Sequence, residues 1–119
     1  MSSISAITLA VRDMSQALAF YSMVGFTLVY GGAEAAFSSL RMGAAYVNLM
    51  QRPDYTPTWW GRVIFYVEDV DRLYAAITAQ GLTPHNPPRD AAWGERFFHI
   101  TDPDGHELSF AKRLGPTPR

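Results

Sequence analysis

Two stretches of the chain, residues 7–28 and 63–84, share the same order of apolar and polar positions at a constant offset of 56 residues. Each opens with alternating side chains, over residues 6–11 and 62–67, which is typical of a half-buried strand. After an aspartate the apolar spacing changes from two residues to about 3.6, which predicts an amphipathic helix. The chain is therefore interpreted as a duplicated unit. The apolar helix positions are Met14, Ala17, Leu18, Tyr21 and Val24 in one copy and Val70, Leu73, Tyr74 and Ile77 in the other.

Four residues mark the ends of the two predicted helices. Asp13 and Asp69 can each accept a hydrogen bond from the free amides of a first helical turn. Gly25 and Gly81 permit the left-handed conformation that ends a helix. Each copy is thus predicted to run strand, helix, strand, with the second strand directly after the glycine.

The rest of each copy is predicted to form strands joined by turns. These strands are expected over residues 26–30, 36–41 and 45–51 in the first copy, and over 96–101 and 106–112 in the second. Residues 102–105 (Asp, Pro, Asp, Gly) suit the turn between the last two strands. Residues 52–61 contain two prolines and two adjacent tryptophans and are expected to be a connector. We expect a single domain, residues 1–119, with modules over 5–51 and 62–113.

Composition and charge narrow the class of protein. With 48% hydrophobic and 18% charged residues, the chain is typical of a globular protein and not of a disordered one. The formal net charge of −1 and the scattered basic residues give no basic stripe, so we expect no nucleic acid partner. The absence of cysteine excludes disulfides, thiolate nucleophiles and zinc-thiolate sites. Without a leader or an apolar stretch near the ~20 residues of a membrane span, we expect a cytoplasmic protein with no membrane partner.

The order of these elements, with the segments LAVRDMSQALAFY (residues 9–21) and DPDGHELSF (residues 102–110), resembles the glyoxalase, bleomycin-resistance and extradiol-dioxygenase superfamily over nearly the whole chain. The resemblance implies an α+β fold of two tandem βαβββ modules. Their curved mixed sheets would surround a ligand-binding cleft, with the helices on the outer faces. It further implies a homodimer, in which clefts form or are completed at the interface and modules are sometimes exchanged between chains.

Metal-dependent members of this superfamily hold a divalent ion through two side chains of each module. The corresponding places in this chain are Ala6, Asn48, Arg62 and Ser109. Ala6 has no donor atom, Arg62 is a permanent cation, and an amide and a hydroxyl are weak neutral ligands. We therefore expect no metal and no other cofactor. A shift of two residues would instead bring Glu107 into the cleft, with His99 from the neighbouring strand, and this alternative stays open.

Aromatic side chains and one cation are the best candidates for ligand contacts. The three tryptophans lie in or beside loops, where large rings often line a binding surface. Arg62 lies on the strand face that points away from the helix, where it would bind an anionic ligand group or pair internally with Glu107. The predicted ligand contacts are Trp59, Trp60, Arg62, Tyr66, Trp93, Tyr46, Asn48, Met50, His99, Glu107 and Ser109.

Other ionisable residues are expected to have no role in the site. His85, among prolines, and His106, after a turn, are expected at the surface. Glu95 and Arg96 are expected to form an ion pair in a loop, with ligand contacts at the cleft rim as the alternative. No residue is assigned a catalytic role.

Two classes of function follow. The first, which we prefer, is a metal-free binding protein, similar to the bleomycin-resistance branch, that sequesters a planar drug-like or metabolite ligand between aromatic side chains. The cation at Arg62 disfavours a cationic glycopeptide such as bleomycin, so a neutral or anionic ligand is expected. The second is an enzyme of the same superfamily: a lyase, isomerase or dioxygenase with a relocated metal, or a metal-free catalyst with Glu107 or His99 as its base.

Overall fold

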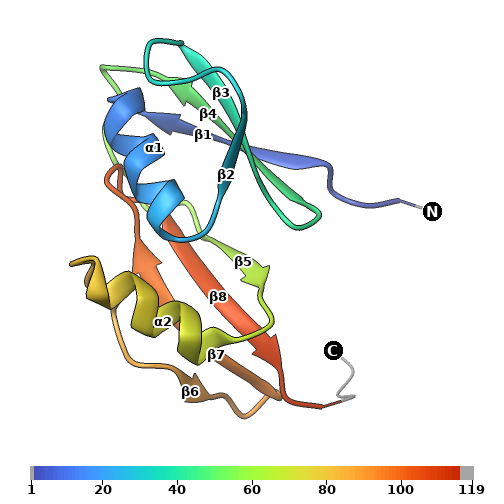
Figure 1. Cartoon of the computed structure of the whole chain (residues 1–119). Coiled ribbons are helices and arrows are strands. Elements are labelled where there is room, and N and C mark those ends of the chain that lie inside the picture. The colour runs from blue at the N-terminus through green and yellow to red at the C-terminus, as the bar shows by residue number, and fades with distance from the viewer. Residues whose placement is uncertain (1, 116–119) are drawn as a thin grey trace. The chain divides into compact units, whose positions relative to one another are not determined.

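A computed structural model describes residues 2–115 and contains, over that range, two helices and eight strands (Figure 1). The first copy forms β1 (Ala6–Val11), α1 (Met14–Met23), β2 (Thr27–Tyr30), β3 (Phe37–Met42) and β4 (Ala45–Gln51). The second copy forms β5 (Arg62–Tyr66), α2 (Val70–Ala79), β6 (Arg89–Asp90), β7 (Glu95–Thr101) and β8 (Glu107–Arg113). Neither helix in the described part of the chain is long and apolar enough to span a membrane.

The chain divides into two compact units. The first comprises Met1–Thr58 together with Asp102–Gly105, and the second comprises Trp59–Thr101 together with His106–Arg119. Each has a four-stranded mixed sheet, ordered β1-β4-β3-β2 in the first unit and β5-β8-β7-β6 in the second. In both sheets the opening strand runs parallel to the closing strand, and the other pairs are antiparallel. The predicted α+β class with two βαβββ units is confirmed, and the single domain stays a prediction.

Both helices begin and end as predicted. The side chains of Asp13 and Asp69 accept hydrogen bonds from the backbone amides two residues into each helix, those of Gln16 and Arg72. Gly25 and Gly81 have positive φ angles, 106° and 92°. Each glycine and the residue after it donate backbone hydrogen bonds into the last turn, which is the Schellman arrangement.

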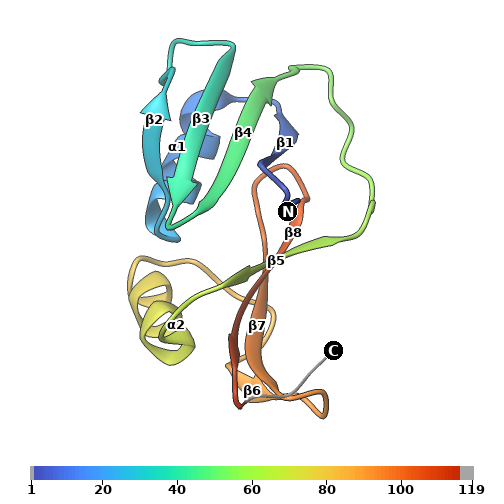
Figure 2. The same cartoon turned by 90° about the vertical axis from the view of Figure 1, so that its right-hand side faces the viewer.

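In each unit the helix packs on one face of its own sheet, and Figure 2 shows α1 behind β2 and β3. The buried residues of the first unit include Leu9, Val11, Leu40, Val47 and Leu49 from the strands and Met14, Ala17, Phe20 and Tyr21 from α1. Those of the second include Phe65, Phe98, Ile100, Leu108 and Phe110 from the strands and Val70 and Ile77 from α2. Because successive strand residues point to opposite faces, the intervening residues lie on the face away from the helix.

One predicted strand is wrong. Residues 82–88, directly after Gly81, form no strand. The backbone N–H of His85 donates a hydrogen bond to His99 O at 2.8 Å, but the strand ladder with β7 begins at Arg89 and Asp90. Three prolines in this segment, Pro84, Pro87 and Pro88, lack the backbone N–H that a ladder needs. The other predicted strands have the observed positions to within one residue.

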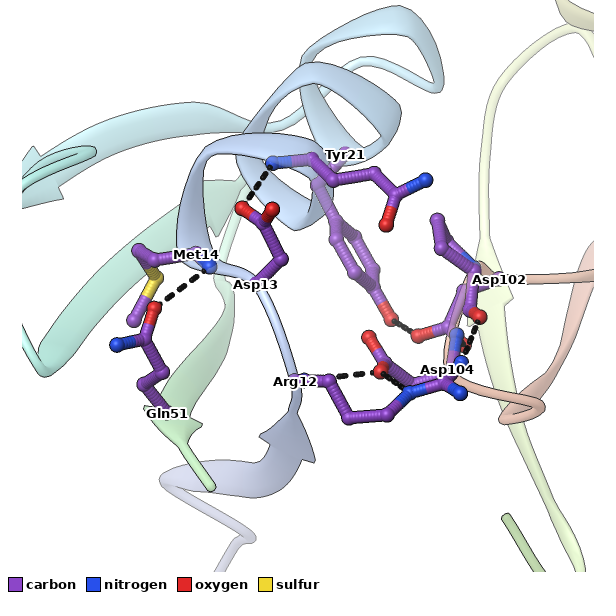
Figure 3. A network of polar contacts seen from close by, with 9 residues as sticks. Arg12, Asp13, Met14, Tyr21, Gln51, Asp102 and Asp104 are labelled. Carbon is purple, nitrogen blue, oxygen red and sulfur yellow. Dashed lines mark hydrogen bonds and ion pairs between the residues drawn. The ribbon is translucent and has the colours of Figure 1, made fainter. Parts of the chain in front are cut away.

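The turn at Asp102–Gly105, which belongs to the first unit, contains two buried carboxylates (Figure 3). Asp104 Oδ1 accepts hydrogen bonds from the backbone N and the Nε of Arg12, at 2.9 and 2.8 Å. Asp102 Oδ2 accepts one from the Tyr21 hydroxyl at 2.6 Å. Burial, and then the charge of Asp102, raises the pKa of Tyr21 well above its ordinary value, so the phenol stays protonated as the donor. This turn is therefore part of a buried polar network and not only a chain reversal.

Candidate functional site

The face of the second sheet that points away from α2 contains an open hollow of about 340 Å³. Its walls come from β5, β7, β8 and the loop before β7. Strand register brings three of its side chains into one row, because Ile64 pairs with Ser109 and Ser109 pairs with His99. The residues that line the hollow are Arg62, Ile64, Trp93, Glu95, Phe97, His99 and Ser109.

One wall of the hollow is a row of aromatic rings. The Trp93 ring stacks on Phe97 with centroids 5.9 Å apart and planes 27° apart. The Phe97 and His99 rings follow at 4.9 Å. The guanidinium of Arg89, on β6, lies 5.2 Å from the Phe97 centroid, within the range of a cation–π contact. This wall offers aromatic surface to a flat ligand.

Glu95 lies at the edge of this wall and is almost fully buried, with 4% of its surface exposed. Its Oε1 accepts a hydrogen bond from Trp93 Nε1 at 3.0 Å, and its Oε2 accepts a short one from the Tyr66 hydroxyl. The predicted loop ion pair between Glu95 and Arg96 is wrong, because both residues belong to β7 and successive strand residues point to opposite faces.

Arg96 points to the face of β7 opposite to Glu95. Its guanidinium forms ion pairs with Asp71 at 2.8 Å and with Asp90 at 3.0 Å. These bonds raise the pKa of Arg96, and the hydrogen bond from Arg96 lowers the pKa of Asp71. All three residues lie outside the lining of the hollow.

Arg62 pairs with Glu107, its neighbour in the register of β5 and β8, with Nη2 and Oε1 2.5 Å apart. This is the internal pair that the sequence left open as an alternative to an anionic ligand. Because the guanidinium already has a counter-charge, Arg62 repels a cationic ligand less than an unpaired guanidinium would.

His99 is the one residue in the described part of the chain whose buried side-chain polar atom, Nδ1, has no hydrogen-bond partner. Burial, followed by the charges of Arg62 and His85, lowers the pKa of His99, and Glu107 opposes this shift. The imidazole is therefore neutral near pH 7 and adds an uncharged ring to the wall.

The residues at the metal positions implied by the resemblance do not fit a divalent ion. Asn48 lies opposite Thr8, with Nδ2 and Oγ1 3.3 Å apart, and Ala6 lies opposite Tyr46 instead. In the shifted alternative, the Arg62 cation lies against the Glu107 carboxylate that would have to bind the metal. Within residues 2–115 no three histidines, aspartates or glutamates gather as a metal site requires.

The remaining predicted contacts lie outside the lining of this hollow. Tyr46, Asn48 and Met50 lie on the helix-free face of the first sheet, and their sharing one cleft with the second sheet stays a prediction. The Tyr66 hydroxyl donates a hydrogen bond to Glu95, and the Glu107 carboxylate accepts one from Arg62. Both partners line the hollow.

The two connector tryptophans differ in their surroundings. Trp59 is largely exposed, whereas Trp60 donates a hydrogen bond from Nε1 to Nδ1 of His106 at 2.7 Å. His106 is buried, so its predicted surface position is wrong. His85 is exposed, as predicted, and its Nε2 lies 2.6 Å from Thr101 Oγ1.

Two residues of the lining were not among the predicted ligand contacts: Phe97 was missed, and Glu95 was given a rim contact only as the alternative to a loop ion pair. Both share a strand face with His99, at two and four positions before it. The strand alternation that puts His99 on this face also predicts Phe97 there. Glu95 lies on the same face, but the strand was predicted to begin only at residue 96.

Relatives of known name are similar to this chain along most of its length. A bleomycin resistance protein of Geobacillus stearothermophilus is 30% identical over 125 aligned residues, which cover 89% of this chain and 93% of that protein. A bleomycin resistance protein of Staphylococcus aureus matches to the same extent.

Solved structures share the fold. The structure of TioX from Micromonospora sp. ML1 is 26% identical with a TM-score of 0.75, and the match covers 94% of this chain and all of TioX. That of a bleomycin-binding protein complexed with bleomycin is 22% identical with a TM-score of 0.78, covering 94% of this chain and 99% of the other.

A family model described as glyoxalase/bleomycin resistance protein/dioxygenase superfamily matches residues 3–110. That range contains all eight strands and both helices except the last residues of β8. The chain therefore belongs to the glyoxalase/bleomycin resistance protein/dioxygenase superfamily.

Proposed function

We propose that this protein binds and sequesters a flat, drug-like or metabolite molecule, without a metal, on the helix-free face of its second sheet. The observation that carries the proposal is the hollow walled by Trp93, Phe97 and His99. Its volume of about 340 Å³ lies at the lower end of the range of roughly 300–1,000 Å³ typical of small-molecule sites. The similarity to bleomycin resistance proteins supports drug binding as its biological role.

The charges around the hollow favour an uncharged ligand. Arg62 has Glu107 as its counter-charge, and both carboxylate oxygens of Glu95 accept hydrogen bonds from protein donors. His99 is neutral near pH 7 because its pKa is lowered. Apolar contact and stacking then contribute most of the affinity, with the Ser109 hydroxyl as a polar contact.

The proposal includes a cytoplasmic homodimer in which further predicted contacts join the site. Tyr46 and Met50, on the first sheet, and Trp59, in the connector, expose large apolar side chains that a ligand or a second copy would cover. Asn48 and Trp60 are proposed to add a polar and an aromatic contact to the ligand.

Titration with two probes in chelator-treated buffer tests the proposal. Bleomycin represents the ligand of the named relatives, and acridone represents an uncharged flat ring. We expect saturable quenching of tryptophan fluorescence by at least one probe. We also expect Trp93→Leu to weaken binding about twofold to tenfold or more, since aromatic pairs contribute ~0.5–1.5 kcal/mol beyond their area.

Tyr30→Leu is the matched control, because Tyr30 is an exposed ring on β2 outside the hollow. Its binding should equal that of the wild type. Binding that Trp93→Leu leaves unchanged would place the ligand elsewhere, and no binding of any flat compound would remove the proposed function.

An enzyme with a relocated metal is the alternative, and its signature is metal-dependent stability. Metal that binds the native state must raise the melting temperature. We expect no saturable shift with nickel, manganese, iron(II) or zinc. A shift that Glu107→Ala abolishes would overturn the metal-free proposal and favour the enzyme.

A further inference from the structure

We propose that Glu95 is the positioning residue of this site: it holds the Trp93 indole in one orientation as a stacking wall and does not itself bind the ligand. Only the predicted effect of Glu95 on ligand affinity rests on the proposed function. The positioning itself is a property of the protein without ligand.

Trp93 needs such a restraint because of its place in the chain. It lies in the short loop between β6 and β7 and is 55% exposed, so little of the protein packs over it. An exposed side chain in a loop ordinarily samples several rotamers. Here the hydrogen bond to Glu95 fixes the edge of the ring, and the Phe97 ring supports its face.

Glu95 suits this role because its own position is fixed. It is buried at the start of β7, and its second carboxylate oxygen accepts the Tyr66 hydroxyl from β5. One carboxylate therefore links a strand of the sheet to the loop that carries the indole. A charge-assisted acceptor binds an indole N–H more strongly than a neutral acceptor does.

The same bonds argue against direct ligand binding by Glu95. Oε1 already accepts from Trp93 and Oε2 from Tyr66, and the side chain is 4% exposed, so a cationic ligand group would compete with internal donors for a carboxylate that it can hardly reach. The loop backbone adds to the restraint, since Ala91 N bonds Glu95 O at 2.6 Å and Gly94 N bonds Ala91 O at 3.0 Å. A flat ring can therefore stack on an indole that is already in the binding orientation.

Preorganisation has a measurable consequence. Immobilising a flexible side chain on binding costs ~0.5–1.5 kcal/mol, which corresponds to about twofold to tenfold in Kd. Releasing Trp93 from Glu95 should weaken binding of a flat ligand by that factor and leave the charge preference of the site unchanged.

Nitrogen-15 relaxation of the Trp93 indole in the ligand-free protein tests the restraint directly. We expect an order parameter near the rigid value of ~0.85 in the wild type and below ~0.6 in Glu95→Leu, which has no acceptor. Glu95→Gln keeps a neutral acceptor and should give an intermediate value. Glu95→Asp, which withdraws the carboxylate by one methylene group, should also release the indole. Glu68→Gln, at an exposed position outside the site, should change nothing. An indole equally ordered with and without the Glu95 carboxylate would overturn the inference.

Tyr66→Phe separates positioning from general destabilisation. It removes the other hydrogen bond of the same carboxylate but leaves the bond to Trp93. We expect lower thermal stability with an ordered indole. Loss of indole order in Tyr66→Phe equal to that in Glu95→Leu would show loosening of the whole sheet edge and contradict a specific role.

A double-mutant cycle with acridone tests the consequence for binding. Glu95→Leu should weaken acridone binding about twofold to tenfold in the wild type and have no further effect in Trp93→Phe. An equal loss in both backgrounds would mean that Glu95 contacts the ligand itself, which contradicts the inference. If acridone binds no variant, the proposed function fails for this probe, while the relaxation data still decide the positioning role.

Discussion

Buried carboxylates are rare because removing a charge from water is costly, and residues 2–115 contain three, Glu95, Asp102 and Asp104. Each accepts hydrogen bonds from named donors of its own unit. The donors come from distant parts of the sequence: Asp104 bonds Arg12 and Asp102 bonds Tyr21 (Figure 3). No local pattern predicts such pairs, which explains why the turn at 102–105 was interpreted as a simple reversal.

Tyr21→Phe isolates one bond of this network. The substitution keeps the buried ring but removes the donor to Asp102, and loss of a buried hydrogen bond to a charged group costs about 1–3 kcal/mol. We expect the free energy of unfolding to fall by that amount in urea titrations at neutral pH. An unchanged midpoint would show that the carboxylate is equally well satisfied without the hydroxyl.

His99 gives the stability of the protein a distinct dependence on pH. Its pKa in the folded state lies below the ordinary 6.5, so below pH 6.5 the unfolded chain takes up a proton that the folded chain does not. We therefore expect stability to fall as the pH drops through 6.5 and to level off below the folded pKa. In His99→Gln this part of the profile should be absent. Identical profiles for the two proteins between pH 7.5 and 5 would rule out this role.

Strand alternation and helix caps are local signals, and they predicted most elements to within one residue. The failures have physical causes. The prolines after Gly81 prevent a strand that the repeat alone predicts, and β7 begins one residue earlier than predicted because Glu95 pairs with Arg113 of β8. Candidate ligand residues on strands could be assigned to a face, but the hollow depends on register and on the loop that presents Trp93.

Two turn glycines with similar backbone conformations provide a matched pair. Gly81 (φ 92°) ends α2 with open space where a Cβ would lie, whereas a Cβ at Gly105 (φ 85°) would lie 2.9 Å from Pro57 Cβ. We expect Gly81→Ala to cost about 1–2 kcal/mol from backbone strain alone, and Gly105→Ala to cost more. Thermal melts of the two variants compare them. Equal losses would mean that Pro57 moves away freely.

At the level of the complete chain, the two copies share one backbone pattern, but the sheet of the second copy is the better candidate site. Both units expose a face without a helix, but within the described residues the hollow with a continuous aromatic wall is formed by the second unit. The corresponding row of the first sheet has Thr8, Asn48 and Ser39 where the second has Ile64, Ser109 and His99. Substitution of these equivalent positions gives the two copies different chemistry on the same backbone.

The proposed function requires that a flat ligand binds against the Trp93 indole. The most direct measurement is a nitrogen-15 NMR titration of the indole N–H signals, of which the three tryptophans give one each. During addition of acridone or bleomycin, we predict that the Trp93 signal shifts saturably. Shifts of the Trp59 and Trp60 signals would report whether these two proposed contacts also join the site. Saturable binding that leaves the Trp93 signal unmoved would contradict the proposed site.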